Sequence, residues 1–148
     1  TYAAGDQAAI ADLPWTRLGV TICYDLRFPH LYRALAEQGC GVLAIPASFT
    51  VPTGEAHWHV LMRARAIENG AFVVAAAQGG RHACGRSTYG HSLIIDPWGR
   101  VIAEADHDEP GVILAEIDTA KVAETRGRIP SLANGRVFSL PGAVPVAS

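Results

Sequence analysis

The sequence predicts a layered α/β domain, and three observations indicate this class. Two short apolar runs, Arg17 to Cys23 and Gly41 to Pro46, flank a segment with helical spacing. A strand, a helix and a strand within about thirty residues are typical of a βαβ unit. The second run is continuously apolar and the first is mostly so, without clear alternation, which indicates strands covered on both faces. Strand and turn patterns dominate the later chain, so a meander rather than an all-parallel sheet is expected.

The elements of the first half follow from turn and helix signals. Arg17 to Cys23 is predicted as a strand because apolar and β-branched residues follow the turn-prone Leu-Pro-Trp segment. Pro29 suits the first turn of a helix, apolar residues follow at helical spacing, and Gly39 ends that helix. Gly41 to Pro46 is then a second strand, and Ala47 to Gly54 is a loop.

The second half is predicted to add a helix and further strands. Apolar residues at helical spacing predict a helix over Glu55 to Asn69, and Ala71 to Ala77 is an apolar strand. The glycine-rich polar stretch Gln78 to Gly90 is predicted as a loop. A hairpin follows, in which a Pro-Trp-Gly-Arg turn joins His91 to Asp96 with Val101 to Ala105.

The last predicted elements are a strand over Gly111 to Asp118 and a short helix near Ala120 to Arg126, before an irregular tail. With 148 residues, 49% of them hydrophobic, the chain is expected to form one domain, residues 1–148. The formal charge of −2 predicts no binding of nucleic acid or of an anionic membrane, which leaves a small-molecule or protein partner. No run is long and apolar enough to span a bilayer, and no signal pattern is found, so a cytoplasmic protein is expected.

The cysteines and paired histidines form no metal or disulfide pattern. The chain has an odd number of cysteines, Cys23, Cys40 and Cys84, and no Cys-x-x-Cys spacing. Free thiols are therefore expected. His57 and His59 are two residues apart, which places them on nearly opposite sides of a helix, whereas helical metal ligands lie four residues apart. No metal and no cofactor is predicted.

Cys23 allows two interpretations. It could be a small buried hydrophobic residue at the end of a strand, which is the ordinary place of a cysteine in an apolar run. It also precedes a sharp turn toward a helix, where hydrolases lift a nucleophile out of a sheet beside free backbone N–H groups. The ligand sites of open α/β sheets lie at this edge too. Its position therefore makes Cys23 a candidate nucleophile.

Three stretches favour the second interpretation: GVTICYDLRFPHLYRALAEQG, PASFTVPTGEAHWHVLMRARAIENGAFVVAAAQGG and STYGHSLIIDPWGRVIAEA. In this order they resemble the nitrilase superfamily of carbon-nitrogen hydrolases, and specifically its Nit-type amidases. The resemblance extends from Tyr2 to Arg136. It implies an αββα sandwich, and it implies that this chain is the C-terminal portion of a longer carbon-nitrogen hydrolase domain, so that the sandwich is incomplete.

The resemblance also implies a catalytic set of glutamate, lysine and cysteine. The thiolate attacks an amide carbon, a glutamate acts as base and then acid, a lysine stabilises the tetrahedral intermediate, and water hydrolyses the thioester. Cys23 matches the nucleophile, and the Tyr24 N–H is the expected oxyanion donor. The family's glutamates and lysine precede this motif, but only Asp6 and Asp12 are acidic before Cys23, and the sole lysine is Lys121. The chain alone is therefore expected to be nearly inactive and to expose apolar surface.

Further residues are expected to shape the substrate pocket. Asp25, Arg27 and Phe28 belong to the nucleophile motif, in which Asp25 and Arg27 either support the pocket or form an ordinary turn ion pair. The residues expected around an acyl pocket lie near the loop after the second strand: Phe49, Thr53, His57 and Trp58. Trp58 fits the core equally well. Arg81 suits a substrate carboxylate.

Two histidines depart from the Nit pattern. His30 and His59 stand where the family usually has glutamates, which replaces an anion by a neutral or cationic group. The change at these positions could remove an ion-pair partner of Arg63 or Arg65. Arg63, Arg65 and Glu68 are either a solvated helix face or, as the resemblance favours, a structural network under the active site.

These residues predict a thiol amidase acting on the terminal amide of a small ω-amido acid or a deaminated glutathione-like substrate. The alternative is a non-catalytic module of the same fold that binds a partner. A cysteine-histidine hydrolase within this chain would need His57 or His91 close to Cys23. The resemblance implies a homo-oligomer.

Overall fold

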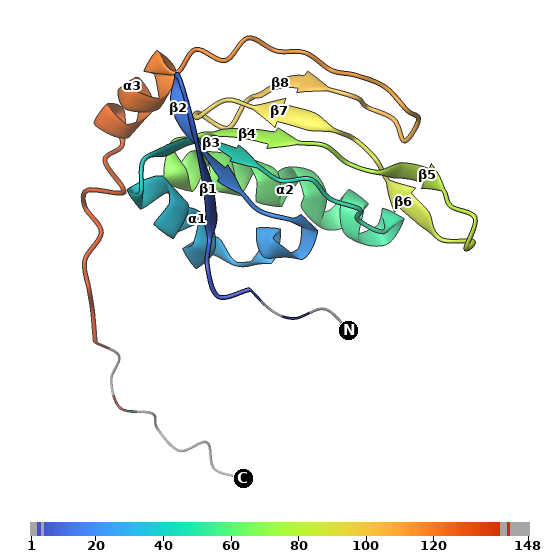
Figure 1. The fold of residues 1–148 in the computed structure, drawn as a ribbon, viewed down its shortest axis with the longest axis horizontal. Coiled ribbons are helices and arrows are strands. Elements are labelled where there is room, and N and C mark those ends of the chain that lie inside the picture. Colours follow the sequence, from blue (N-terminus) through green and yellow to red (C-terminus); the bar gives the residue numbers. More distant parts are fainter. Residues whose placement is uncertain (1–2, 4, 140–141, 143–148) are drawn as a thin grey trace.

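The computed structural model describes residues 3, 5–139 and 142 and has a six-stranded mixed sheet at its centre (Figure 1). The strand order is β1-β2-β3-β4-β7-β8. Strands β2, β3 and β4 run parallel, and the other pairs are antiparallel. The strand bounds, in chain order, are Ala9–Leu13, Thr16–Val20, Cys40–Ala44, Phe72–Ala75, Leu93–Ile95 and Val101–Glu104. The βαβ unit and the α/β class predicted from the sequence are confirmed.

Two helices cover one face of the sheet, and a third lies on the other side (Figure 1). α1 (Pro29–Glu37) and α2 (Val51–Asn69) contact each other, and α2 packs on β4 and β7. α3 (Ala120–Arg128) contributes Val122 to a small apolar cluster with Phe72 on the opposite face. The layers are therefore a pair of helices, the sheet, and a thinner cover made by α3 and the segment that leads to it.

The main core lies between the sheet and the helix pair. Its largest fully buried side chains come from both helices and from the central strands: Trp58, Tyr32, Leu35, Leu43, Met62, Leu93 and Ile95. Removal of this apolar surface from water is the dominant favourable term in folding. The core thereby fixes α1 and α2 against the strand ends at which the candidate site lies.

Besides the early end of β2 at Val20, four segments differ from the sequence predictions. A strand, β1, precedes the Pro-Trp turn where none was predicted, and α2 begins earlier than expected, at Val51. The predicted loop Gln78 to Gly90 contains a two-stranded ribbon, β5 (Gly79–Arg81) and β6 (Ser87–Tyr89). The predicted strand over Gly111 to Asp118 is wrong, because this segment pairs with no strand among the described residues.

The segment before α3 has the alternating burial of a strand without its pairing. Ile113, Ala115 and Ile117 are half-buried, whereas Val112 and Leu114 are each 87% exposed. Contiguous exposed apolar side chains mark interaction surfaces. Val112 and Leu114 are therefore part of the exposed apolar surface, which also includes Val60 and Ile67 of α2.

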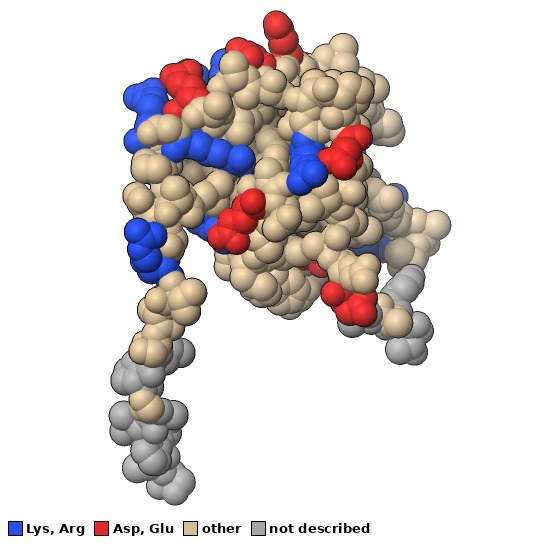
Figure 2. Space-filling model, turned by 60° about the vertical axis from the view of Figure 1, so that its left-hand side comes forward, with Lys and Arg blue, Asp and Glu red and all other residues tan. Residues whose placement is uncertain are grey.

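The molecular surface carries charges of both signs. On the side that Figure 2 brings forward, basic and acidic side chains lie close to one another and form no field of one sign. This agrees with the formal charge of −2. Among the helices of the described residues, none combines the length and the apolar composition needed to cross a membrane.

Gly54 lets α2 pass close to β6. A Cβ atom at this position would overlap the ring of Tyr89. Gly54→Ala is therefore expected to destabilise the protein by about 1–3 kcal/mol, the usual cost of overpacking, measured by chemical denaturation. Gly127 in α3 is the matched control, because nothing lies near a Cβ atom there and alanine is the better helix former. Equal losses in Gly54→Ala and Gly127→Ala would contradict the packing explanation.

Tyr32 of α1 is buried, and its hydroxyl shares a hydrogen bond of 2.8 Å with the Thr21 hydroxyl just after β2. Burial raises the pKa of Tyr32 to about 12, from an ordinary value of 10.0. The folded protein keeps this proton where the unfolded chain loses it, so the contribution to stability is complete below pH 10.0 and is lost as the pH rises through about 12. Alkaline denaturation is expected to show this loss, and Tyr32→Phe to remove that part of the pH dependence. An unchanged slope in Tyr32→Phe would show that another group is responsible.

Candidate active site

Cys23 lies at the carboxyl edge of the parallel strands. β2 ends at Val20, earlier than predicted, and a short 3-10 helix, η1 (Cys23–Arg27), begins the turn toward α1. The Cys23 N–H donates to the Pro46 carbonyl at 2.8 Å, just beyond β3. Cys23 has a φ of +48°, a left-handed value that non-glycine residues adopt only where the surrounding structure imposes it. The chain thus turns sharply at the half-buried thiol.

A cavity of about 840 Å³ opens beside Cys23. It is lined by the segments that follow β2, β3 and β4 and by two later segments, one before β7 and one after β8. Its titratable lining residues are Cys23, His82, His91, His107, Asp108 and Glu109. A cavity of this size at the carboxyl ends of parallel strands is typical of a small-molecule site.

His91 lines the same cavity and is the second non-glycine residue with positive φ in the described chain, at +61°. Its ring stacks on Tyr89 at 3.9 Å, and its Nδ1 donates to the Tyr89 carbonyl at 2.6 Å. Because a carbonyl only accepts, Nδ1 carries the proton, and Nε2 of neutral His91 is an acceptor. Strained backbone concentrates at functional sites, so Cys23 and His91 together mark this cavity as the candidate active site.

The turn after Cys23 leaves one backbone donor free beside the thiol. Among the described residues, the Tyr24 N–H has no acceptor, while the Asp25 N–H donates to the Ile22 carbonyl at 3.0 Å. The Asp25 carboxylate in turn accepts from the Ile22 N–H at 2.8 Å, which closes the turn on both sides of Cys23. The Tyr24 side chain is 65% exposed and lies outside the cavity lining.

Among the ion pairs of the described residues there is none between Arg27 and Asp25, so the ordinary turn ion pair is not formed. The Arg27 guanidinium lies 5.3 Å from the Phe49 ring centroid, and Nη1 and Nη2 are each 3.4 Å from His57 Nδ1. Phe28 is exposed and lies beside His30, with ring centroids 6.0 Å apart. Of the two histidines that a cysteine-histidine hydrolase would need, the cavity lining therefore includes His91 and not His57.

The remaining predicted substrate residues also lie outside the cavity lining. Phe49 and Trp58 are buried with ring centroids 5.1 Å apart, and Trp58 is 0% exposed, which fits its core interpretation. Thr53 donates to the Thr50 carbonyl in the first turn of α2, and Arg81 is exposed on β5. Of the site residues predicted from the sequence, only Cys23 lines the cavity.

The two arginines of α2 keep partners despite the histidine at position 59. Arg65 is buried and its Nη1 donates to Glu68 at 2.7 Å, and Arg63 donates to a backbone carbonyl of the Pro-Trp-Gly-Arg turn at 2.8 Å. His59 lies 2.5 Å from the Glu104 carboxylate of β8. Arg65 therefore keeps a carboxylate partner, whereas Arg63, which is exposed, binds a backbone carbonyl and has no ion pair among the described residues. The structural network favoured by the resemblance is found at Arg65 and Glu68.

Three titratable cavity residues were not anticipated: His107, Asp108 and Glu109. Their only sequence signal is a charged stretch after the hairpin, His-Asp-Glu, where polar residues also suit a plain turn. The sole lysine, Lys121, lines a separate and smaller cavity beside Trp98. The described residues thus place carboxylates, but no lysine, beside Cys23.

A family model described as carbon-nitrogen hydrolase matches residues 1–127. The chain belongs to this family. It is 45% identical over 139 residues to a deaminated glutathione amidase of Yersinia enterocolitica, a match that covers 94% of this chain and 48% of that protein. This carbon-nitrogen hydrolase chain therefore spans about half the length of the curated relative.

Solved structures of the family share the fold described above. The NitFhit protein of C. elegans is 43% identical with a TM-score of 0.85, over 92% of this chain and 33% of that one. A mutant of the amidase from Nesterenkonia sp. AN1 is 25% identical with a TM-score of 0.76, over 91% and 47%. That structure shows covalent addition of the acetamide moiety of fluoroacetamide at its active site cysteine. The resemblance to Nit-type carbon-nitrogen hydrolases is confirmed.

Proposed function

We propose that this chain carries the nucleophile of a thiol amidase and that Cys23 is that nucleophile. The observation that supports this most is the left-handed Cys23, which begins the turn after β2 and lines the cavity. A thiol at a strained strand-to-helix turn is the arrangement that exposes a nucleophile beside backbone donors. The modified cysteine in the related amidase supports the same role.

The chemistry proposed for Cys23 is acyl transfer. The thiolate attacks the amide carbon, and the resulting oxyanion accepts a hydrogen bond from the Tyr24 N–H, which is free among the described residues. Collapse of this intermediate breaks the carbon–nitrogen bond, and ammonia leaves with the proton that a general acid provides. Water then attacks the thioester, which releases the carboxylic acid and regenerates the thiol.

A general base and a stabilising cation are needed besides Cys23, because a free thiol is mostly protonated at neutral pH. Asp108 and Glu109 are the carboxylates of the cavity, and Lys121 lies at a different site. We propose that a further portion of the polypeptide supplies the base and the lysine. The chain by itself is accordingly expected to show almost no turnover.

The proposed substrate is a small ω-amido acid or a deaminated glutathione-like amide. The name of the Yersinia relative supports this class, and the cavity of about 840 Å³ is large enough for such a molecule. The test is ammonia release by the full-length gene product across a panel of ω-amides and simple peptide amides. Release from the ω-amides supports the proposal, whereas binding without release from any amide would favour the non-catalytic module.

A homo-oligomer and a cytoplasmic location complete the proposal. The outer side of α2 exposes Val60 and Ile67 at 60% and 49%, which suits a face covered by a second copy. All three cysteines are free, as is usual for proteins of a reducing compartment. Sedimentation of the wild type against Val60→Glu tests the first point, since a charge in a covered apolar face is expected to favour the monomer.

A further inference from the structure

The turn that carries Cys23 is held from the helix side by a buried guanidinium. We infer that Arg65 is a positioning residue for Cys23: its two hydrogen bonds to the Leu26 carbonyl keep the η1 turn closed and the thiol in the cavity. The inference depends on the proposed function only in calling Cys23 the nucleophile. The positioning role concerns only the conformation of the η1 turn and does not require amide hydrolysis.

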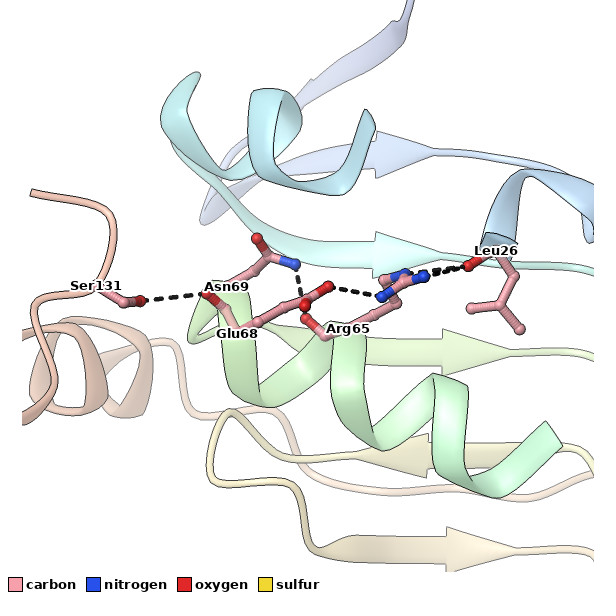
Figure 3. Close-up of polar contacts among 5 residues, drawn as sticks. All are labelled: Leu26, Arg65, Glu68, Asn69 and Ser131. Carbon is pink, nitrogen blue, oxygen red and sulfur yellow. Dashed lines mark hydrogen bonds and ion pairs between the residues drawn. The ribbon is translucent and has the colours of Figure 1, made fainter. Parts of the chain in front are cut away.

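Two of the hydrogen bonds of Arg65 go to η1, at the Leu26 carbonyl (Figure 3). Arg65 Nη2 and Nε donate to this carbonyl at 2.6 Å and 3.1 Å. Leu26 is 0% exposed, so without Arg65 its carbonyl would be an unpaired acceptor in the core, a costly arrangement. A carbonyl at the end of a helical turn is also where a cation is most favourable. Arg65 thus stabilises the last turn of the segment that begins at Cys23.

The Arg65 side chain is itself fixed by other contacts, as it must be to hold η1 in position. Its Nη1 donates to the Glu68 carboxylate at 2.7 Å, and its guanidinium lies 5.3 Å from the Tyr32 ring centroid. The Arg65 carbonyl accepts from the Asn69 side chain at 2.8 Å, and the Glu68 carbonyl accepts from the Ser131 hydroxyl at 3.2 Å (Figure 3). The arginine therefore has a defined position relative to α2 as well as to η1.

Without the hydrogen bonds from Arg65, the conformation of the turn at Cys23 is expected to change in one direction. Cys23 at φ +48° is strained, and the unstrained alternative for a residue after a strand is extended backbone. In an extended chain, residues two apart share one face, so Cys23 would then lie on the same face as Thr21. Thr21 is 3% exposed and hydrogen-bonded to buried Tyr32. A relaxed turn is therefore expected to move the thiol from the cavity into the core.

The three cysteines provide an internal readout in the chain as it stands. Cys23 is half-buried at the cavity, Cys84 is exposed on the β5–β6 ribbon, and Cys40 is buried in β3. Burial raises the pKa of the Cys40 thiol, which protects it further from alkylation. Under native conditions, labelling of Cys84 gives the reference rate, and absence of label on Cys40 reports that the protein is folded.

The experiment is alkylation by iodoacetamide, with the label on each cysteine followed by peptide mass spectrometry. In Arg65→Met, the ratio of Cys23 to Cys84 labelling is expected to fall about tenfold. The reason is that relief of the backbone strain at Cys23 shifts the equilibrium between the strained and the relaxed turn by roughly a factor of ten. Arg65→Lys replaces the planar guanidinium by a single ammonium nitrogen, which keeps the charge but not both hydrogen bonds to the Leu26 carbonyl. A smaller fall in the ratio, about threefold, is expected. Arg63→Met removes a similar arginine-to-carbonyl bond on α2 and is expected to leave the ratio unchanged.

An unchanged ratio in folded Arg65→Met, or an equal fall in Arg63→Met, would overturn the inference. If Cys40 becomes labelled in Arg65→Met, that variant is unfolded and the test depends on Arg65→Lys. An unchanged Cys23 to Cys84 labelling ratio in folded Arg65→Lys also overturns the inference. The readout needs no amide turnover. Failure of ammonia release would therefore reject the proposed function and leave the labelling result unaffected. An unchanged labelling ratio would reject the positioning role of Arg65 and leave the proposed function unaffected.

Discussion

Replacing Cys23 by alanine is expected to reduce ammonia release by the full-length gene product by about 10⁴-fold or more, the usual scale for loss of a covalent nucleophile. The reason is chemical: without the thiol no thioester forms, and neither the Tyr24 N–H nor the cavity can replace the missing bond. The rate of ammonia release at saturating substrate measures this loss. KM is not the informative quantity here, since the residues that bind the substrate are unchanged.

Cys84→Ser is the matched control for that substitution. Cys84 is an exposed thiol on the β5–β6 ribbon and does not line the cavity. Its replacement is expected to leave the rate within a factor of about two, as for a surface change away from the site. A comparable loss in both variants would mean that the rate depends on thiol content in general, which is incompatible with a single nucleophile at Cys23.

The largest expected effect on stability comes from Trp58→Ala. Trp58 is 0% exposed, its ring lies 5.1 Å from that of Phe49, and its Nε1 donates to the His91 carbonyl at 2.7 Å. Removal of the indole is expected to cost about 3–5 kcal/mol in the free energy of unfolding, because a large cavity opens between α2 and the sheet. Chemical denaturation measures the loss.

Two further variants separate packing from hydrogen bonding at Trp58. Trp58→Phe keeps much of the packing but leaves the His91 carbonyl without its donor, for an expected cost of about 1–3 kcal/mol. Trp15, 53% exposed in the turn between β1 and β2, is the control, and Trp15→Ala is expected to change stability by about 0.5 kcal/mol or less. A Trp58→Ala protein as stable as Trp15→Ala would contradict the core assignment.

The parts of the fold that could be predicted are those in which local pattern and burial agree. Residues 40–44 and 72–75 are continuously apolar and are central parallel strands, and Pro29 and Gly70 stand at the start and end of helices as their backbone preferences require. Cys23 was identifiable because its position at a strand end carries chemical meaning. These signals lie within a few neighbouring residues.

The parts that could not be predicted depend on pairing between distant segments. β1 is largely exposed, so its sequence lacks a clear buried face, and β5 and β6 are glycine-rich or polar strands held by backbone hydrogen bonds that any sequence can make. The segment over residues 111–118 has strand-like composition, but a strand exists only where a partner accepts its hydrogen bonds. Asp108 and Glu109 reach the cavity because the chain after β8 returns to it.

If Cys23 is the acyl-transfer nucleophile, the substrate must become attached to it during turnover. The intact mass of the full-length gene product is measured after incubation with a slowly hydrolysed ω-amide and compared between the wild type and Cys23→Ala. A covalent acyl adduct is expected in the wild type, located on the Cys23 peptide, and none in Cys23→Ala. An adduct of equal yield in Cys23→Ala, or ammonia release by the wild type with the acyl group trapped on another residue, would contradict this role of Cys23.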